Sequence, residues 1–257
     1  MNPCSSAGTR LQFRLGSMCH WVLPFCVLLL AACTQKTAVS AAASPDAGGS
    51  AATAPDTTQT LPDSGPLPHF DGAAAMQYVR DVVAFGPRWV GSPGHEKLEA
   101  FLRSKLKSDN LEEDSFTTQT PVGDLAMRNF IAKFPGARDG IIVVAGHYDT
   151  LYNRPDFVGA NDAGSSTGLL LQLAHNLRAQ MKDGKREGYS VWLVWLDGEE
   201  AFKKWTYNED SVYGSRHLAA KWQAAGTLKQ VKAFLLVDMV GDADLNIDRD
   251  ASSTPWL

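Results

Sequence analysis

The 257-residue sequence has no cysteine after its first 33 residues. All four cysteines, Cys4, Cys19, Cys26 and Cys33, precede the part of the chain that can form a folded domain. Such a domain therefore has no internal disulfide and no thiolate that could bind a metal. Any metal in it must be held by His, Asp or Glu side chains.

The sequence also lacks a long basic run and an internal repeat. Its formal net charge is −4. Proteins that bind nucleic acids usually carry a basic patch or stripe, and none is visible here. We therefore expect no nucleic-acid partner.

The N-terminus has the pattern of an export signal. Arg10 and Arg14 precede an apolar run, Trp21–Ala32, which is too short to cross a hydrocarbon core of about 30 Å. The run ends in Leu-Ala-Ala-Cys33, which resembles the lipobox of bacterial lipoproteins, where Cys33 would carry the lipid. A plain secretory signal or a short membrane anchor is the alternative. We expect export to the bacterial cell envelope or secretion, with membrane contact only through this N-terminal anchor.

Composition divides the rest of the chain into two parts. Residues 34–66 consist mainly of Ala, Ser, Thr, Pro, Gly and Asp, and they contain too little apolar surface to offset the entropy of ordering. We interpret them as a disordered linker. Residues 67–257 are interpreted as one domain.

Within this domain, continuous apolar runs alternate with helical patterns. The expected strands are 129–134, 141–145, 189–196 and 233–237, and the expected helices are 73–85, 94–106, 169–177 and 213–222. Continuous apolar strands interleaved with helices indicate an α/β fold: a three-layer, mostly parallel, mixed sheet with helices on both faces.

Four polar clusters lie near the predicted carboxyl ends of these strands, where sheets of this class bind ligands. They are His147–Asp149, Gly159–Asp162, Asp197–Glu200 and Asp238. Each alone has a simple alternative, such as a solvated turn or, for Asp162, a helix N-cap. Together they predict one polar crevice.

The adjacent Glu199 and Glu200 point to a cation. Two carboxylates in one crevice repel each other unless a positive charge lies between them. Carboxylate and imidazole ligands suit zinc, and a catalytic zinc usually has three protein ligands and one open position. One glutamate can then bind the metal while its neighbour acts as a base.

Five short motifs, in this order, resemble the M28 metallopeptidase superfamily, and the resemblance runs from about Asp71 to Asp238. They are Phe85–Arg88, Gly91–Gly94, His147–Asp149, Gly159–Asp162 and Glu199–Glu200. The segments Asp197–Phe202 and Asp210–Ala219 are similar to those of glutaminyl-peptide cyclotransferases, whereas aminopeptidases usually have a shorter gap between them. This favours the cyclotransferase branch.

The resemblance implies a zinc-dependent cyclotransferase that converts the N-terminal glutamine of peptides or proteins to pyroglutamate and releases ammonia. Asp162 and Glu200 would bind one zinc ion, and Glu199 would transfer the proton. Asp238 would join the catalytic hydrogen-bond network. Trp205 would line the substrate pocket, with simple packing as its alternative role.

Two other functions remain open on the same residues. A two-zinc aminopeptidase of the superfamily would use His147 and Asp238 to hold a second zinc, with Asp162 bridging the two ions and Asp149 orienting the His147 imidazole. A lipid-anchored shell that has lost its activity would bind no metal.

One feature departs from the superfamily pattern, which supplies a further zinc-binding histidine near the C-terminus. No histidine follows His217, and residues 251–257 resemble the start of another segment. We therefore expect the C-terminal part of the domain, with the third zinc ligand, to be missing from this sequence.

The remaining motif residues have structural explanations. His175 and His217 lie within helical patterns and match no ligand position, so we expect packing or solvent-exposed roles for both. Arg88, Tyr148 and Arg216 match motif positions, and turn and packing roles are expected for them.

Overall fold

A computed structural model describes residues 69–206, 209–246 and 253–254. The predicted signal peptide with Cys33 and the predicted linker lie outside these residues and stay predictions. Among the helices in the described part of the chain, none combines the length and hydropathy needed to cross a membrane.

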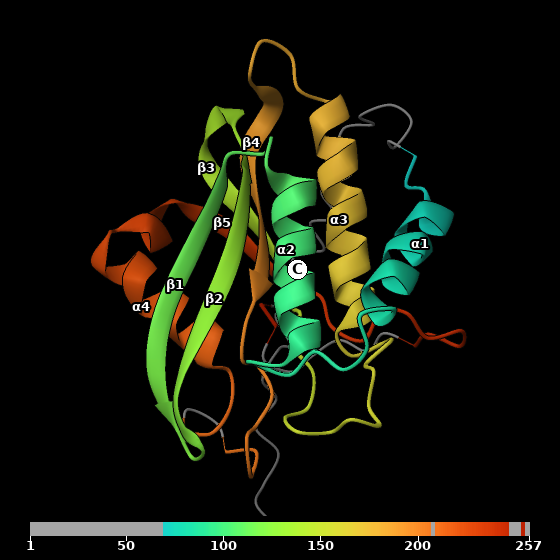
Figure 1. Cartoon of the computed structure of the whole chain (residues 1–257). Coiled ribbons are helices and arrows are strands. Elements are labelled where there is room, and N and C mark those ends of the chain that lie inside the picture. Colours follow the sequence, from blue (N-terminus) through green and yellow to red (C-terminus); the bar gives the residue numbers. More distant parts are fainter. Residues whose placement is uncertain (1–68, 207–208, 247–252, 255–257) are drawn as a thin grey trace, which may run out of the picture. The chain divides into compact units, whose positions relative to one another are not determined.

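Five strands form one mixed sheet in the order β1-β2-β4-β3-β5 (Figure 1). β4 and β5 are both parallel to β3, whereas β2 is antiparallel to both β1 and β4. The strands are β1 (Leu111–Thr120), β2 (Gly123–Phe134), β3 (Gly136–His147), β4 (Arg186–Leu196) and β5 (Val231–Leu236). The four strands expected from the sequence are present, and β1 was not predicted.

Helices cover both faces of the sheet, which confirms the three-layer α/β prediction. On one face lie α1 (Gly72–Val83), α2 (Pro93–Leu106) and α3 (Gly164–Ala179). On the other face, α4 (Tyr213–Ala224) packs through Leu218 and Trp222. A short 3-10 helix, η1 (Thr227–Gln230), precedes β5.

The first two helices begin at side-chain caps that can be read from the sequence. The Asp71 carboxylate accepts the N–H of Ala74 at 3.0 Å. The Ser92 hydroxyl accepts the N–H of His95 at 3.2 Å, and a proline occupies the first turn of α2. The start of α2, and with it the direction of the His95 side chain, is therefore fixed locally.

The core is built around the central strands. Trp195 of β4, Phe130 of β2 and Leu170 of α3 are fully buried, and each such side chain contributes roughly 1.5–3 kcal/mol of burial free energy. α1 packs closely on α3 because Gly168 has no side chain: a Cβ there would lie 2.8 Å from the Ala75 carbonyl oxygen. This core holds the carboxyl ends of β3 and β4, whereas most side chains of the edge strand β5 stay exposed.

Candidate metal centre

The sheet register brings the predicted polar clusters together. His147, the last residue of β3, pairs with Leu196 at the end of β4, and Ala145 pairs with Leu236 of β5. Residues that follow these strands therefore leave the sheet at the same level. As the sequence predicted, the polar clusters meet at this edge.

Three of the predicted site residues form a group that could hold a metal ion. Nε2 of His147 lies 2.9 Å from Oδ1 of Asp162 and 3.4 Å from Oδ1 of Asp238. Each residue offers one ligand atom, and all three atoms lie within 4.8 Å of one another. Both ring nitrogens of His147 are buried, and neither has an aligned hydrogen-bond partner. A buried imidazole nitrogen that faces two carboxylates without such a bond fits a shared cation.

Asp149 connects this group to the glutamate pair. Its carboxylate lies 3.5 Å from Nδ1 of His147 and accepts the backbone N–H groups of Glu199 and Glu200 at 3.0 and 3.2 Å. Asp149 is almost fully buried. Burial alone would lower the pKa of His147, but the neighbouring carboxylates, Asp149 first, raise this pKa well above 6.5.

Both glutamates have raised pKa values. Burial and nearby carboxylates raise the pKa of Glu199 to about 7, although His147 opposes the shift. Burial, followed by Asp149 and other carboxylates, raises the pKa of Glu200 to about 8. The region therefore holds more carboxylates than its own positive charge can balance, which is a further property of a cation site. A carboxyl group with a pKa near 7 can also accept and return a proton close to neutral pH.

Glu200 does not belong to the group formed by His147, Asp162 and Asp238. Its side chain is largely buried, and Asp162 is one of the carboxylates that raise its pKa. Glu200 is therefore close enough to Asp162 for their charges to interact, and His147 approaches Asp162 to 2.9 Å.

The loop that carries the glutamates is held by the first turn of α4. Residues 212, 213 and 214 donate their N–H groups to the carbonyl oxygens of residues 199, 198 and 197 at 2.8, 2.8 and 2.9 Å. The first N–H groups of a helix have no acceptor within the helix, and here the carbonyl oxygens of the loop accept them. Val212 has a φ of 49°, which is unusual for a β-branched residue and marks a tightly constrained turn.

Arg88 fixes the loop that leads to Asp162. Its guanidinium is fully buried and donates to the carbonyl oxygens of Val158 at 2.6 Å and Gly159 at 2.9 Å. Burial lowers the pKa of Arg88 to about 10, although Asp149 and Asp162 oppose this shift. The turn role expected for Arg88 is therefore only part of its function, because it also holds the carbonyl groups just before a predicted metal ligand.

A cavity of about 910 Å³ opens beside this group. His147, Glu199 and Asp238 lie at its polar end. The other described lining residues are mostly apolar and come from α4 and β5, among them Leu218, Ala219, Trp222, Phe234 and Leu236. Trp205 is half exposed and is not among them, so its substrate-binding role stays a prediction.

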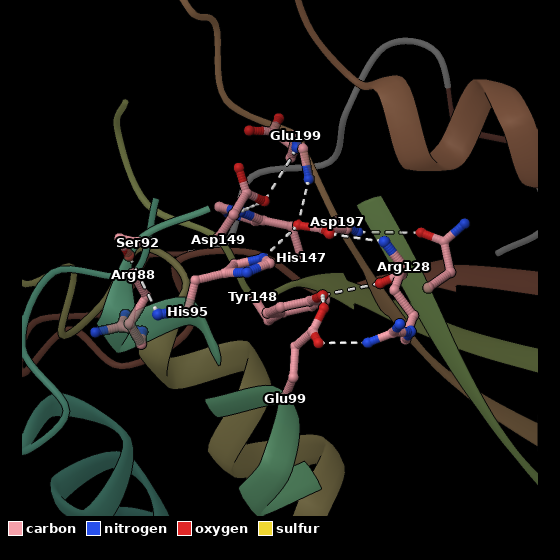
Figure 2. Close-up of polar contacts among 12 residues, drawn as sticks. Arg88, Ser92, His95, Glu99, Arg128, His147, Tyr148, Asp149, Asp197 and Glu199 are labelled. Carbon is pink, nitrogen blue, oxygen red and sulfur yellow. Dashed lines mark hydrogen bonds and ion pairs between the residues drawn. The ribbon is translucent and has the colours of Figure 1, made fainter. Parts of the chain in front are cut away.

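A second group of similar composition lies deeper, at the start of α2. His95, Glu99 and Asp197 also offer ligand atoms within 4.8 Å of one another. Here Nε2 of His95 is hydrogen-bonded to Oδ1 of Asp197 at 2.8 Å, and Glu99 forms an ion pair with Arg128 (Figure 2). Burial alone would lower the pKa of His95, but Asp197 raises it above 6.5. Every member of this group already has a protein partner.

This second group was not predicted from the sequence. His95 and Asp197 are 102 positions apart, and the only local signal was the Ser-Pro-Gly-His pattern that starts α2. The other two histidines in helices are as expected. His217 stacks on Phe116 at 4.0 Å between ring centroids and lies 3.3 Å from Asp114, and His175 is exposed.

Comparisons with known proteins point to one family. Residues 129–255 match the model of peptidase family M28. A glutaminyl cyclase from an Acidobacteriales bacterium is 53% identical with a TM-score of 0.71, and the match covers 77% of this chain and 68% of that one. The Drosophila melanogaster glutaminyl-peptide cyclotransferase is 35% identical over 162 residues, which are 62% of this chain and 46% of that protein. The chain thus spans just under half the length of this curated relative.

The fold has a broader likeness as well. A Zn-dependent exopeptidase from Parabacteroides distasonis has a TM-score of 0.55 at 24% identity, with 68% of this chain and 64% of that one covered. At this identity the likeness concerns the fold alone, and it places the structure in the zinc-exopeptidase-like class of α/β proteins. The chain belongs to peptidase family M28, in its glutaminyl cyclase branch.

Proposed function

We propose that this chain is a zinc-dependent glutaminyl-peptide cyclotransferase, which converts the N-terminal glutamine of peptides to pyroglutamate with release of ammonia. The observation that carries the proposal is the 53% identity to a glutaminyl cyclase across most of the chain. The carboxylate-rich centre around Asp162 also supports it, because this centre can hold a cation.

In this proposal Asp162 and Glu200 hold the ion. When bound, zinc supplies Lewis-acid polarisation of an amide carbonyl. The nucleophile is the substrate's own α-amine, so catalysis depends on holding amine and amide in a near-attack arrangement. A new C–N bond closes the ring, and the C–N bond to the leaving nitrogen breaks.

Glu199 moves the proton between these two nitrogens. It takes a proton from the attacking amine and returns it to the departing ammonia. Its position at the polar end of the cavity, beside Asp238, gives it access to a substrate N-terminus. Asp238 would join the catalytic hydrogen-bond network at the same end, and its carboxylate lies 3.4 Å from the His147 imidazole.

A comparison of two peptides tests the proposal. The chain is loaded with zinc and given a Gln-initiated peptide and a Leu-initiated peptide of otherwise equal sequence. We expect ammonia and a pyroglutamyl peptide from the first and no free leucine from the second. Absence of ammonia release from a chain that has bound one equivalent of zinc would contradict the proposal.

One observation favours a second candidate, the two-zinc aminopeptidase. The group of three potential ligands includes His147, which the cyclotransferase proposal does not use as a ligand. In the aminopeptidase, His147 and Asp238 would hold a second ion and Asp162 would bridge both. Free leucine from the Leu-initiated peptide, with two equivalents of zinc bound, would favour this candidate. An inactive shell would retain no stoichiometric zinc after dialysis.

A further inference from the structure

A closed circuit of contacts, buried or partly buried, lies next to the segment that carries His147 (Figure 2). His95 donates from Nε2 to Oδ1 of Asp197 at 2.8 Å, and Oδ2 of Asp197 accepts the backbone N–H of Arg128 at 2.8 Å. The carbonyl oxygen of Arg128 accepts the hydroxyl of Tyr148 at 2.8 Å. The Tyr148 ring stacks on the His95 imidazole, with 5.2 Å between centroids and 21° between planes. This closed set of contacts among His95, Asp197, Arg128 and Tyr148, called the contact ring, therefore joins α2, β2 and the segments that follow β3 and β4.

Two members of this ring adjoin the predicted site residues. Tyr148 directly follows His147, and Asp197 precedes the turn that leads to Glu199 and Glu200. Oδ1 of Asp197 also accepts the N–H of Gly198 at 2.9 Å, so the carboxylate fixes the first step of that turn. A shift of Asp197 would therefore move the glutamates relative to His147.

His95 is the member whose loss would release this arrangement. Its side chain is 4% exposed and that of Asp197 is 0% exposed, so water cannot readily replace the donor. Of the three N–H donors to the Asp197 carboxylate, two are backbone groups and His95 is the side chain. The Ser92 cap fixes His95 in the first turn of α2, which anchors the turn to a rigid helix.

We propose that His95 is a positioning residue, which holds the Asp197–Glu200 turn at a fixed distance from the segment that carries His147. This inference rests on the proposed function only where it concerns zinc. The structural part, the position of the turn, can be measured without metal. Partners beyond the metal ligands typically change metal affinity by about 10–100-fold.

The test compares His95→Gln with His95→Met. The two replacement side chains have nearly the same length and volume, but only glutamine can donate an N–H to Asp197. Leu102→Ala is the matched control, because Leu102 lies on the same helix, is fully buried and belongs to the core rather than to the ring. If His95→Met does not fold, His95→Asn replaces it, since the shorter amide does not reach Asp197.

Two quantities are measured in each folded variant. The first is the set of backbone amide NMR shifts of residues 198–200 in metal-free protein. The second is zinc affinity, by competition with a chromophoric chelator. We expect His95→Met to displace these amide signals and to weaken zinc binding about tenfold. We expect His95→Gln to restore both quantities, and Leu102→Ala to lower the thermal midpoint without changing either.

The outcomes separate this inference from the proposed function. If His95→Met moves the amide signals no more than Leu102→Ala does, or binds zinc as tightly as the parent, the positioning role is wrong. If the parent chain binds no zinc but the signals still move in His95→Met and return in His95→Gln, the positioning role stands and the proposed function fails.

Discussion

Two groups of the same residue types lie at the carboxyl ends of the parallel strands, and they differ in how their charges are satisfied. In the His95–Glu99–Asp197 group, the imidazole is aligned with a carboxylate and each carboxylate accepts protein N–H groups. In the His147–Asp162–Asp238 group, the imidazole is buried without an aligned hydrogen bond. Composition and proximity therefore do not distinguish the two groups, whereas the lack of an aligned hydrogen bond at His147 makes its group the candidate metal site.

Exposure differs in the same direction. Asp197 is 0% exposed at its side chain, whereas the side chains of Asp162 and Asp238 are 29% and 43% exposed. In the His95–Glu99–Asp197 group, called the inner group, the His95 and Asp197 side chains are 4% and 0% exposed, which suits a structural role. The His147–Asp162–Asp238 group, called the outer group, opens on the cavity and can receive both an ion and a substrate.

The largest expected effect concerns catalysis at Glu199, which lines the same cavity as His147 and Asp238 of the outer group. Glu199→Gln removes the proton acceptor while preserving shape, and we expect turnover of a Gln-initiated peptide to fall by about 10²–10⁴-fold. Zinc content should remain at the parent level. Glu96→Gln, on the exposed face of α2, is the control and should retain full turnover. An equal loss of turnover in Glu199→Gln and Glu96→Gln would contradict a specific catalytic role for Glu199.

The next effect concerns stability at the inner group. Asp197→Ala leaves the buried His95 without its partner, and we expect the free energy of unfolding to fall by about 3–5 kcal/mol. Asp238→Ala in metal-free protein should cost only about 0–1 kcal/mol, because its carboxylate is partly exposed. Urea unfolding without metal measures both. Similar losses at the two positions would show that both groups are structural.

Metal affinity provides a third contrast. Asp162→Asn should weaken zinc binding by about 100-fold or more, since even partners outside the ligand shell cost about 10–100-fold. Glu99→Gln changes the corresponding acid of the inner group and should bind zinc as the parent does. Chelator competition compares the two. A loss of zinc affinity only in Glu99→Gln would indicate that zinc binds at the inner group, and would contradict the assignment of the metal to Asp162.

The smallest effect concerns pH. Burial alone would raise the pKa of Asp114, but hydrogen bonds from Lys221 and Asn129 lower it below its ordinary value of 3.8. Asn129 donates to the Asp114 carboxylate and accepts the backbone N–H of Asp197, so it links Asp114 to the inner group. A lowered folded-state pKa stabilises the protein above pH 3.8, and this contribution is lost as the pH falls through the folded-state value.

Asp114→Asn should therefore cost about 1–2 kcal/mol of unfolding free energy at pH 7. The difference from the parent should shrink below pH 3.8. Urea unfolding at a series of pH values measures this, and a difference that is the same at pH 7 and pH 3 would contradict the assigned cause.

The sequence predicted the central sheet because β3, β4 and β5 are continuous apolar runs that alternate with helices. It did not predict β1, because Glu112, Glu113 and the threonines make that strand polar, and most of its side chains are not buried. Its pairing with β2 depends on the rest of the sheet rather than on its own apolar pattern. The strand therefore has no signal that local reasoning can detect.

The site was predictable to a similar degree. Residues that follow apolar strands were expected at one edge, and His147, Asp162 and Asp238 do meet there. The roles of His95 and Arg88 were not predictable, because each depends on partners about 70 to 100 positions away. Asp197 resembled a solvated turn residue in the sequence, and only the fold shows that it is fully buried.

The most direct test of the account is an anomalous difference map, recorded at the zinc absorption edge, from crystals of the chain grown with zinc. We expect a peak in contact with the Asp162 carboxylate, with Glu200 or His147 as a neighbouring ligand, and none between His95 and Asp197. A map without a peak at Asp162, or with its peak at the inner group, would contradict the account.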